Sequence, residues 1–207
     1  MPSWMFSQAA ALLSVGVLAA VLTAPVNAAE PVNVKDGKAL LAPDNTRLQF
    51  VCAHLGDKPD PRTGTFAKFT GAVEADASTK TLKSLSLEID ANSLTTEIAK
   101  LTAHLKSPDF FDTREHPKAG FVGKKFMPGA AAGEFKVTGD LTLHGVTKEI
   151  SVPVKAAFTG SGLTVTSEFA IDRSEFGMKY GLDKVEKNVT ITFVIGEKNK
   201  VFSEAGK

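Results

Sequence analysis

The stretch EFKVTGDLTLHGVTKEISVPVKAAF, residues 134–158, decides the fold class. On both sides of the His144-Gly145 pair, apolar side chains recur at alternate positions with mostly polar residues between them. This period of two places apolar side chains on one face of an extended strand and polar ones on the other. Because the connection is short, the pattern predicts two antiparallel strands joined by a turn at His144-Gly145.

The same alternation extends outward along most of the chain. Six further strands are expected, and the segment at 65–75 needs a bulge to place Phe66 and Phe69 on the same face. Glycines at 133, 145, 160 and 162 separate several of these runs. The further expected strands are RLQFVCAHL (47–55), TFAKFTGAVEA (65–75), LSLEID (85–90), the weaker KAGFVGKKF (118–126), LTVTSEFAID (163–172) and NVTITFVI (188–195).

One segment has a helical period instead. In LTTEIAKLTAHLK, residues 94–106, apolar side chains recur every three to four positions, at Leu94, Ile98, Leu101 and Leu105. Ser93 or Thr95 can cap the start of this helix, and Pro108 ends it because its ring cannot continue the turn.

These elements predict an all-β fold, with about eight antiparallel strands and one short helix near one end. Such strands form either a sandwich with a solid core or a closed barrel. The Phe-rich inner face favours an eight-stranded barrel, which is just wide enough to hold one small ligand. Periodicity alone leaves the sandwich open.

Residues 1–28 contain no Asp, Glu, Lys or Arg, and an apolar run extends from Ala9 to Ala24. The pattern is typical of a secretory signal peptide cleaved near Ala28, although its start lacks a basic residue. The alternative is a retained anchor, for which the run is short. The expected product is a single domain, 29–207, in the periplasm or secreted, without a stable membrane anchor.

Charge and cysteine content exclude several classes. Lys and Arg number 24 against 23 Asp and Glu, so no basic surface for nucleic acid is indicated. The only cysteine, Cys52, excludes an internal disulfide and lies too far from Ala28 to carry a lipid at a mature N-terminus. The sequence gives no evidence for a cofactor, and a homodimer stays open.

Catalytic motifs are absent from the sequence: there is no G-x-S-x-G, H-E-x-x-H, G-x-G-x-x-G, P-loop or C-x-x-C. The four histidines lack the spacing that places two of them on one zinc ion, so no metal site is predicted. Cys52 and His54 share a strand face, but a free Cys is usually a small buried hydrophobe. We therefore expect no catalytic residues.

One loop, LKSPDFFDTREHPKAGF (105–121), holds three carboxylates, of Asp109, Asp112 and Glu115, and a histidine beside two phenylalanines. It is consistent either with a hydrolase loop using Asp109, Asp112 and His116 or with a capped turn that closes an apolar opening. We favour the capped turn, with Ser107 as cap and Phe110 and Phe111 turned inward.

Five segments, in order, resemble the YceI family of lipocalin-like polyisoprenoid-binding proteins. They are HLG (54–56), TGTFAKFTG (63–71), HLKSPDFFD (104–112), GDLTLHGVTK (139–148) and DRSEFGM (172–178). The likeness spans about residues 41–196, and it departs from the family at Cys52-Ala53 and in the proline-rich loop GDKPDPRTG (56–64). The resemblance implies an eight-stranded barrel with an apolar pocket for a polyprenyl chain or a quinone tail.

The expected function is to bind, and to sequester or carry, an isoprenoid lipid without chemical change. There are two alternatives. One is an enzyme that acts on a small apolar substrate through the 105–121 loop, and the other is an envelope stress or interaction protein without a ligand. Phe110, Phe111, Phe176 and Tyr180 are expected at the mouth, and Arg47, His144 and Arg173 are candidate head-group contacts. The candidate pocket residues are Phe50, Phe66, Leu87, Ile89, Phe121, Phe135, Val137, Leu141, Val152, Val154, Phe169 and Ile171.

Overall fold

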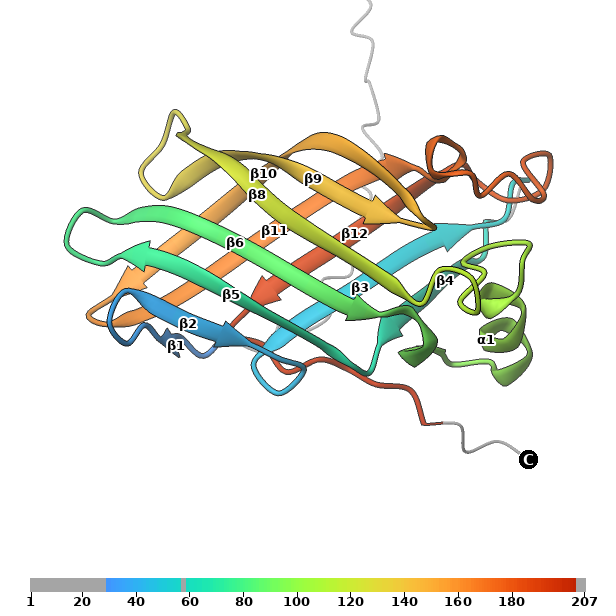
Figure 1. Cartoon of the computed structure of the whole chain (residues 1–207), viewed down its shortest axis with the longest axis horizontal. Coiled ribbons are helices and arrows are strands. Elements are labelled where there is room, and N and C mark those ends of the chain that lie inside the picture. Colours follow the sequence, from blue (N-terminus) through green and yellow to red (C-terminus); the bar gives the residue numbers. More distant parts are fainter. Residues whose placement is uncertain (1–28, 57–58, 204–207) are drawn as a thin grey trace, which may run out of the picture.

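The computed structural model describes residues 29–56 and 59–203, which form one curled antiparallel sheet with a helix at one end (Figure 1). The helical elements are η1 (Ala91–Ser93), α1 (Ala99–Lys106) and η2 (Arg173–Phe176). The strands are β1 (Val32–Asn33), β2 (Lys38–Leu41), β3 (Thr46–Ala53), β4 (Pro61–Phe66), β5 (Phe69–Asp76), β6 (Thr81–Asp90), β7 (Leu94–Thr96), β8 (Lys118–Pro128), β9 (Glu134–Leu143), β10 (Val146–Thr159), β11 (Gly162–Asp172) and β12 (Asn188–Ile195).

The sheet curls so that strands near its two ends, β4 and β5, are consecutive in the chain. The strand order is β2-β5-β6-β8-β9-β10-β11-β12-β3-β4-β7, with β1 paired to β11. β4 pairs with β3, whereas β5 pairs with β6, and only Ala67 and Lys68 separate β4 from β5. The stretch 61–76 thus belongs to both ends of the curled sheet, and the lipocalin-like all-β class is confirmed.

The expected number of eight strands is wrong, because the described residues contain twelve. Short strands β1, β2 and β7 have two to four residues and carry no readable alternation. The stretch at 65–75 divides at the expected irregularity, since β4 ends at Phe66 and β5 begins at Phe69. Both rings are buried on the inner side.

The turn between β9 and β10 has the predicted place and a tight geometry. Leu143 pairs with Val146, which leaves only His144 and Gly145 as the loop. Both have positive φ, 51° for His144 and 72° for Gly145. Two left-handed residues in a two-residue loop match the twist of the flanking strands. This turn therefore holds the His144 side chain at the same end of the sheet as α1.

The helix begins later than the sequence predicts. Leu94 is completely buried in β7, opposite Phe66 of β4, so the apolar spacing that includes it is only partly helical. Ile98 is the N-cap, in place of Ser93 or Thr95, and its apolar side chain accepts no capping hydrogen bond. The helix ends at Lys106, before Pro108, as expected.

The interior is packed along most of its length with the apolar faces of the long strands. Val73, Val137, Leu163, Val165 and Ile195 are almost fully buried and fill the end away from α1. No helix among the described residues is long and apolar enough to cross a membrane. The expected signal peptide at 1–28 lies outside the described residues.

Candidate functional site: an apolar cavity beneath a lid

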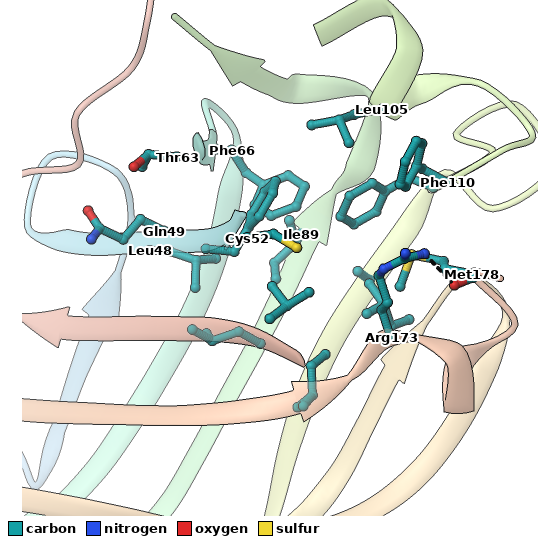
Figure 2. A pocket seen from close by; sticks show the side chains of 18 of the residues that line it. Leu48, Gln49, Cys52, Thr63, Phe66, Ile89, Leu105, Phe110, Arg173 and Met178 are labelled. Atoms are coloured by element: carbon teal, nitrogen blue, oxygen red, sulfur yellow. Dashed lines mark hydrogen bonds between the residues drawn. The ribbon is translucent and has the colours of Figure 1, made fainter. Parts of the chain in front are cut away.

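A cavity of about 370 Å³ lies inside the curled sheet at the end covered by α1 (Figure 2). Its wall combines inner faces of the long strands with side chains from α1, the loop after it and the segment that follows η2. Aliphatic and aromatic side chains dominate this wall. The volume falls within the range of about 300–1,000 Å³ that small-molecule sites usually have.

Ten of the twelve candidate pocket residues lie on this cavity wall. They come from seven strands, and most of them lie at alternating positions that turn inward, which is why the sequence could indicate them. Contact with a ligand stays a prediction for each of them. The ten are Phe50, Phe66, Leu87, Ile89, Phe121, Leu141, Val152, Val154, Phe169 and Ile171.

Phe135 and Val137 do not line the cavity, and their placement there is wrong. They share the inner face of β9 with Leu141 but lie nearer the closed end, where both are buried in the packed core. A Cβ built on Gly139 would lie 2.7 Å from Cζ of Phe121. The Phe121 ring therefore covers β9 at Gly139, between Val137 and Leu141. The cavity therefore ends between Leu141 and Val137, because side chains fill the interior from Val137 toward the end away from α1.

The mouth carries a cluster of aromatic rings. Phe110 and Phe111, here called the lid, both lie on the cavity wall, and Phe110 is buried. The Phe111 ring lies 5.6 Å from Phe50 and 5.9 Å from Phe66 between ring centroids. Tyr180 stacks edge-on with Phe110 at 5.5 Å and is half exposed. The lid is therefore held against the strands by aromatic packing.

Phe176, which the sequence also places at the mouth, is not on the cavity wall. Its side chain is 2% exposed and belongs to the core, because η2 turns it away from the opening. Met178, two residues later, lines the cavity in its place.

Arg173 is a buried cation on the cavity wall (Figure 2). Its Nε donates to the Glu186 carbonyl at 3.0 Å, Nη1 to Met178 at 2.8 Å and Nη2 to Val185 at 3.2 Å. The guanidinium carbon lies 5.6 Å from the centroid of the Phe110 ring. Burial lowers the pKa of the guanidinium, which still remains charged near neutral pH.

The Arg173 guanidinium retains unused donors. It has five N–H bonds, and the three carbonyls account for three of them. Within the described residues no carboxylate lies within salt-bridge distance of it, although Asp172 is its neighbour in sequence. The side chain therefore offers positive charge and free N–H groups at a wall made mostly of apolar side chains.

Arg47 and His144, the other two candidate head-group contacts, lie off the cavity wall. Arg47 donates from Nε to Glu197 at 2.6 Å, and this ion pair occupies it. His144 turns toward η2, where its Nδ1 lies 3.0 Å from the carbonyl oxygen of Phe176. Neither side chain can reach a head group inside the cavity in this arrangement.

Cys52 lies on the wall as a half-buried thiol (Figure 2). Its Sγ donates to the Glu186 carbonyl at 3.3 Å. Burial raises the pKa of the thiol more than the nearby Arg173 lowers it. A protonated thiol that already donates to a carbonyl is a poor nucleophile, which weighs against a Cys52 and His54 pair.

The polar residues of the 105–121 loop do not converge on the cavity. The Asp109 carboxylate lies 2.9 Å from Nε2 of His104 at the surface. Asp112 and His116 face His144 instead. Ser107 is the C-cap of α1 and accepts from the Asp109 N–H at 3.4 Å, so the expected capped turn is present. Asp109 therefore has a different partner from Asp112 and His116, and none of the three lines the cavity.

Several wall residues were missed by sequence reasoning. Leu48, Val189, Ile191 and Phe193 share the inner faces of β3 and β12, and their alternation could have indicated them. Leu101 and Leu105 reach the cavity from α1, which no sequence pattern placed over the opening.

The chain matches the model of the YceI-like domain over residues 40–196. It belongs to the YceI-like family. This confirms the resemblance carried by the five segments, and the matched range agrees with the expected core of about 41–196. The cavity, the lid and Arg173 all lie inside the YceI-like range.

Relatives of the same family support this assignment. A UPF0312 protein of Shewanella denitrificans is 28% identical, covering 86% of this chain and 95% of its own length. The crystal structure of Burkholderia cenocepacia BcnA is 27% identical with a TM-score of 0.66, covering 72% of this chain and 94% of that one.

A structure described as a polyisoprenoid binding domain from Saccharophagus degradans, implicated in plant cell wall breakdown, has a TM-score of 0.60. It is 20% identical and covers 78% of this chain and 97% of that one. At this identity the likeness concerns the fold alone.

Proposed function

We propose that the protein binds an isoprenoid lipid in the apolar cavity and sequesters or carries it without chemical change. The observation that carries this proposal is the mostly apolar cavity beneath the lid, within a YceI-like domain. The polyisoprenoid-binding description of the Saccharophagus domain supports the class of ligand. Asp109, Asp112 and His116 do not line the cavity, which favours binding over turnover of a ligand held there.

Burial of an apolar chain supplies a large favourable contribution to the binding free energy. Each buried CH₂ contributes about 0.8 kcal/mol, so roughly ten buried carbons give about 8 kcal/mol before association costs. If association had no cost, that amount would correspond to a Kd of about 1 μM, so these carbons alone bind more weakly than that. Chain length beyond the cavity adds little, because those carbons stay outside the wall.

Arg173 is proposed as the contact for an oxygen-rich head group, either a phosphate or a quinone carbonyl. Its free N–H groups suit either acceptor, and a phosphate would also neutralise the buried charge. In Arg173→Met the ratio of affinities for a prenyl phosphate and the matching prenyl alcohol should fall toward one. Because both probes are measured on the same variant, a change in folding cancels from this ratio. An unchanged ratio would exclude the head-group role.

We further propose that the protein acts outside the cytoplasm after cleavage near Ala28. The support is the uncharged leader with its apolar run at 9–24. Fractionation of cells expressing the full chain, with N-terminal sequencing of the product, tests this. An uncleaved cytoplasmic product would contradict it.

The cavity itself can be tested by a pair of matched substitutions. Ala119 lies on the cavity wall, whereas Ala156 lies in the packed core, and both are 7% exposed. Ala119→Leu extends into open space and should weaken binding of a fluorescent prenyl probe at least tenfold with little loss of stability. Ala156→Leu overpacks the core and should lower stability by about 1–3 kcal/mol while leaving affinity unchanged. Equal affinities in Ala119→Leu and the parent protein would contradict the proposal.

A further inference from the structure

Three side chains that can ligate a metal meet beside the lid, away from the cavity wall. A carboxylate oxygen of Asp112 and one ring nitrogen each of His116 and His144 all lie within 4.8 Å of one another. The two imidazoles pack at a centroid distance of 4.6 Å with 66° between their planes. Two imidazole nitrogens and one carboxylate oxygen form a donor set that suits Zn²⁺ and neighbouring transition metals.

Two of the three ligands are joined by a short turn. The Asp112 carbonyl accepts from the backbone N–H of Glu115 at 3.1 Å and of His116 at 2.8 Å. Asp112 itself has a φ of 41°, and its N–H donates to Ser107 at 2.9 Å. The turn thus holds the Asp112 and His116 side chains on one side of the loop, four residues apart.

The third ligand is oriented by a contact outside the cluster. His144 Nδ1 lies 3.0 Å from the Phe176 carbonyl oxygen, which can only accept, so Nδ1 carries the hydrogen. The lone pair of the neutral ring is then on Nε2, free for a metal ion. A ligating histidine commonly has this arrangement, with its other nitrogen donating to a carbonyl or carboxylate.

Glycines leave the room in which the two rings approach. A Cβ at Gly145 would lie 2.7 Å from Cε1 and Nδ1 of His116, and one at Gly177 would lie 3.0 Å from Nδ1 of His144. A side chain at either position would require the neighbouring ring to move. The close approach of the two imidazoles therefore depends on both glycines.

We propose that Asp112, His116 and His144 bind one divalent transition-metal ion, with Zn²⁺ as the first candidate and a fourth position open to water. Metal–ligand bonds of about 2.0–2.2 Å require the three ligand atoms to close in by small side-chain rotations. The bound ion would join the loop after α1, the β9–β10 turn and, through Phe176, the end of η2. It would thereby fix the segment that immediately follows the lid.

Zn²⁺ titration of the metal-free protein tests the proposal. The full chain is stripped with a chelator, dialysed and titrated with Zn²⁺ in a calorimeter, and Co²⁺ binding is followed by its visible absorption bands. One ion per chain is expected. Asp112→Asn and His116→Gln should each weaken binding at least tenfold. Asn is a suitable replacement because it tolerates the positive φ at position 112.

His104→Gln is the matched control, since His104 also lies beside a carboxylate, that of Asp109, but outside the cluster. Its affinity for Zn²⁺ should equal that of the parent protein. The melting temperature of each variant in chelator checks that the fold is intact, and His144→Asn replaces any variant that fails to fold. Absence of saturable binding, or equal affinity in the parent, Asp112→Asn and His116→Gln, would overturn the proposal.

Discussion

Removal of the Phe111 ring should loosen the hold on the ligand far more than it harms the fold. Phe111 packs against Phe50 at 5.6 Å and Phe66 at 5.9 Å, and each such aromatic pair is worth about 0.5–1.5 kcal/mol beyond area burial. The side chain is half-buried, so Phe111→Ala should cost about 2–3 kcal/mol, below the 3–5 typical of a fully buried Phe. The melting temperature should then fall by about 5–10 °C.

The ring is also part of the wall that a bound chain must pass. Loss of its contact with the chain, worth about 1.4 kcal/mol, corresponds to a tenfold faster release. The assay follows transfer of a labelled prenyl lipid from the protein to vesicles, well below the melting temperature. We expect release from Phe111→Ala to be about tenfold faster than from the parent protein.

Phe158→Ala serves as the matched control. Phe158 is half-buried against the core on β10 but does not line the cavity. The same substitution there should lower stability to a similar extent without changing the release rate. The reasoning is refuted if Phe111→Ala releases lipid at the parental rate, or if both variants accelerate release equally.

Three further outcomes are expected. A Cβ at Gly64 would overlap the Phe50 ring, so Gly64→Ala should lower the free energy of unfolding by about 1–3 kcal/mol. The midpoint of urea unfolding should fall accordingly, and an unchanged midpoint would contradict this packing. Ser174 and then Lys187 donate to Asp172 and lower its pKa from 3.8 to about 2. The ionised Asp172 therefore stabilises the folded state above about pH 4, and this stabilisation is lost as the pH falls toward 2. In Asp172→Asn the free energy of unfolding should depend less on pH between 4 and 2 than in the parent protein. The same pH dependence in both proteins would argue against this. Because burial raises the pKa of Cys52, iodoacetamide should alkylate it more slowly than free cysteine at pH 8, and an equal rate would show an exposed thiol.

The long strands could be predicted because alternation reports directly which face of a strand is buried. From β9 and β10 outward, every strand of eight residues or more coincides with a stretch expected to be a strand, whereas β4 lies mostly in the proline-rich stretch 56–64 that was expected to be a loop. The short β7 could not be predicted, since three residues carry no period. Its Leu94 was assigned to the helix because an isolated apolar residue fits both spacings.

The sequence could predict which side chains face the interior, but not how far along each strand the cavity extends. Alternation places Val137 and Leu141 on the same face of β9, yet only Leu141 reaches the cavity. The level at which side chains close the interior depends on packing between strands, here the Phe121 ring over Gly139. No pattern within one strand contains that information.

The cluster of Asp112, His116 and His144 lay beyond sequence reasoning for a related reason. A search for paired histidines overlooks a carboxylate four residues before His116. His144 lies far from Asp112 and His116 in the sequence, and the three come together only because β8 pairs with β9 in the fold. Arg173 was indicated as a head-group contact, but its burial and its three carbonyl partners follow from the loop after η2, which has no regular pattern.

The central claim is that the cavity holds an isoprenoid lipid, and the most direct measurement is mass spectrometry of the lipid that copurifies with the protein. The protein is purified from its own host without detergent, extracted with organic solvent and analysed beside the Ala119→Leu variant. We expect about one prenyl-chain species per chain from the parent protein and a clear reduction in the variant. A parent protein that carries no lipid, or one whose lipid content Ala119→Leu leaves unchanged, would contradict the claim.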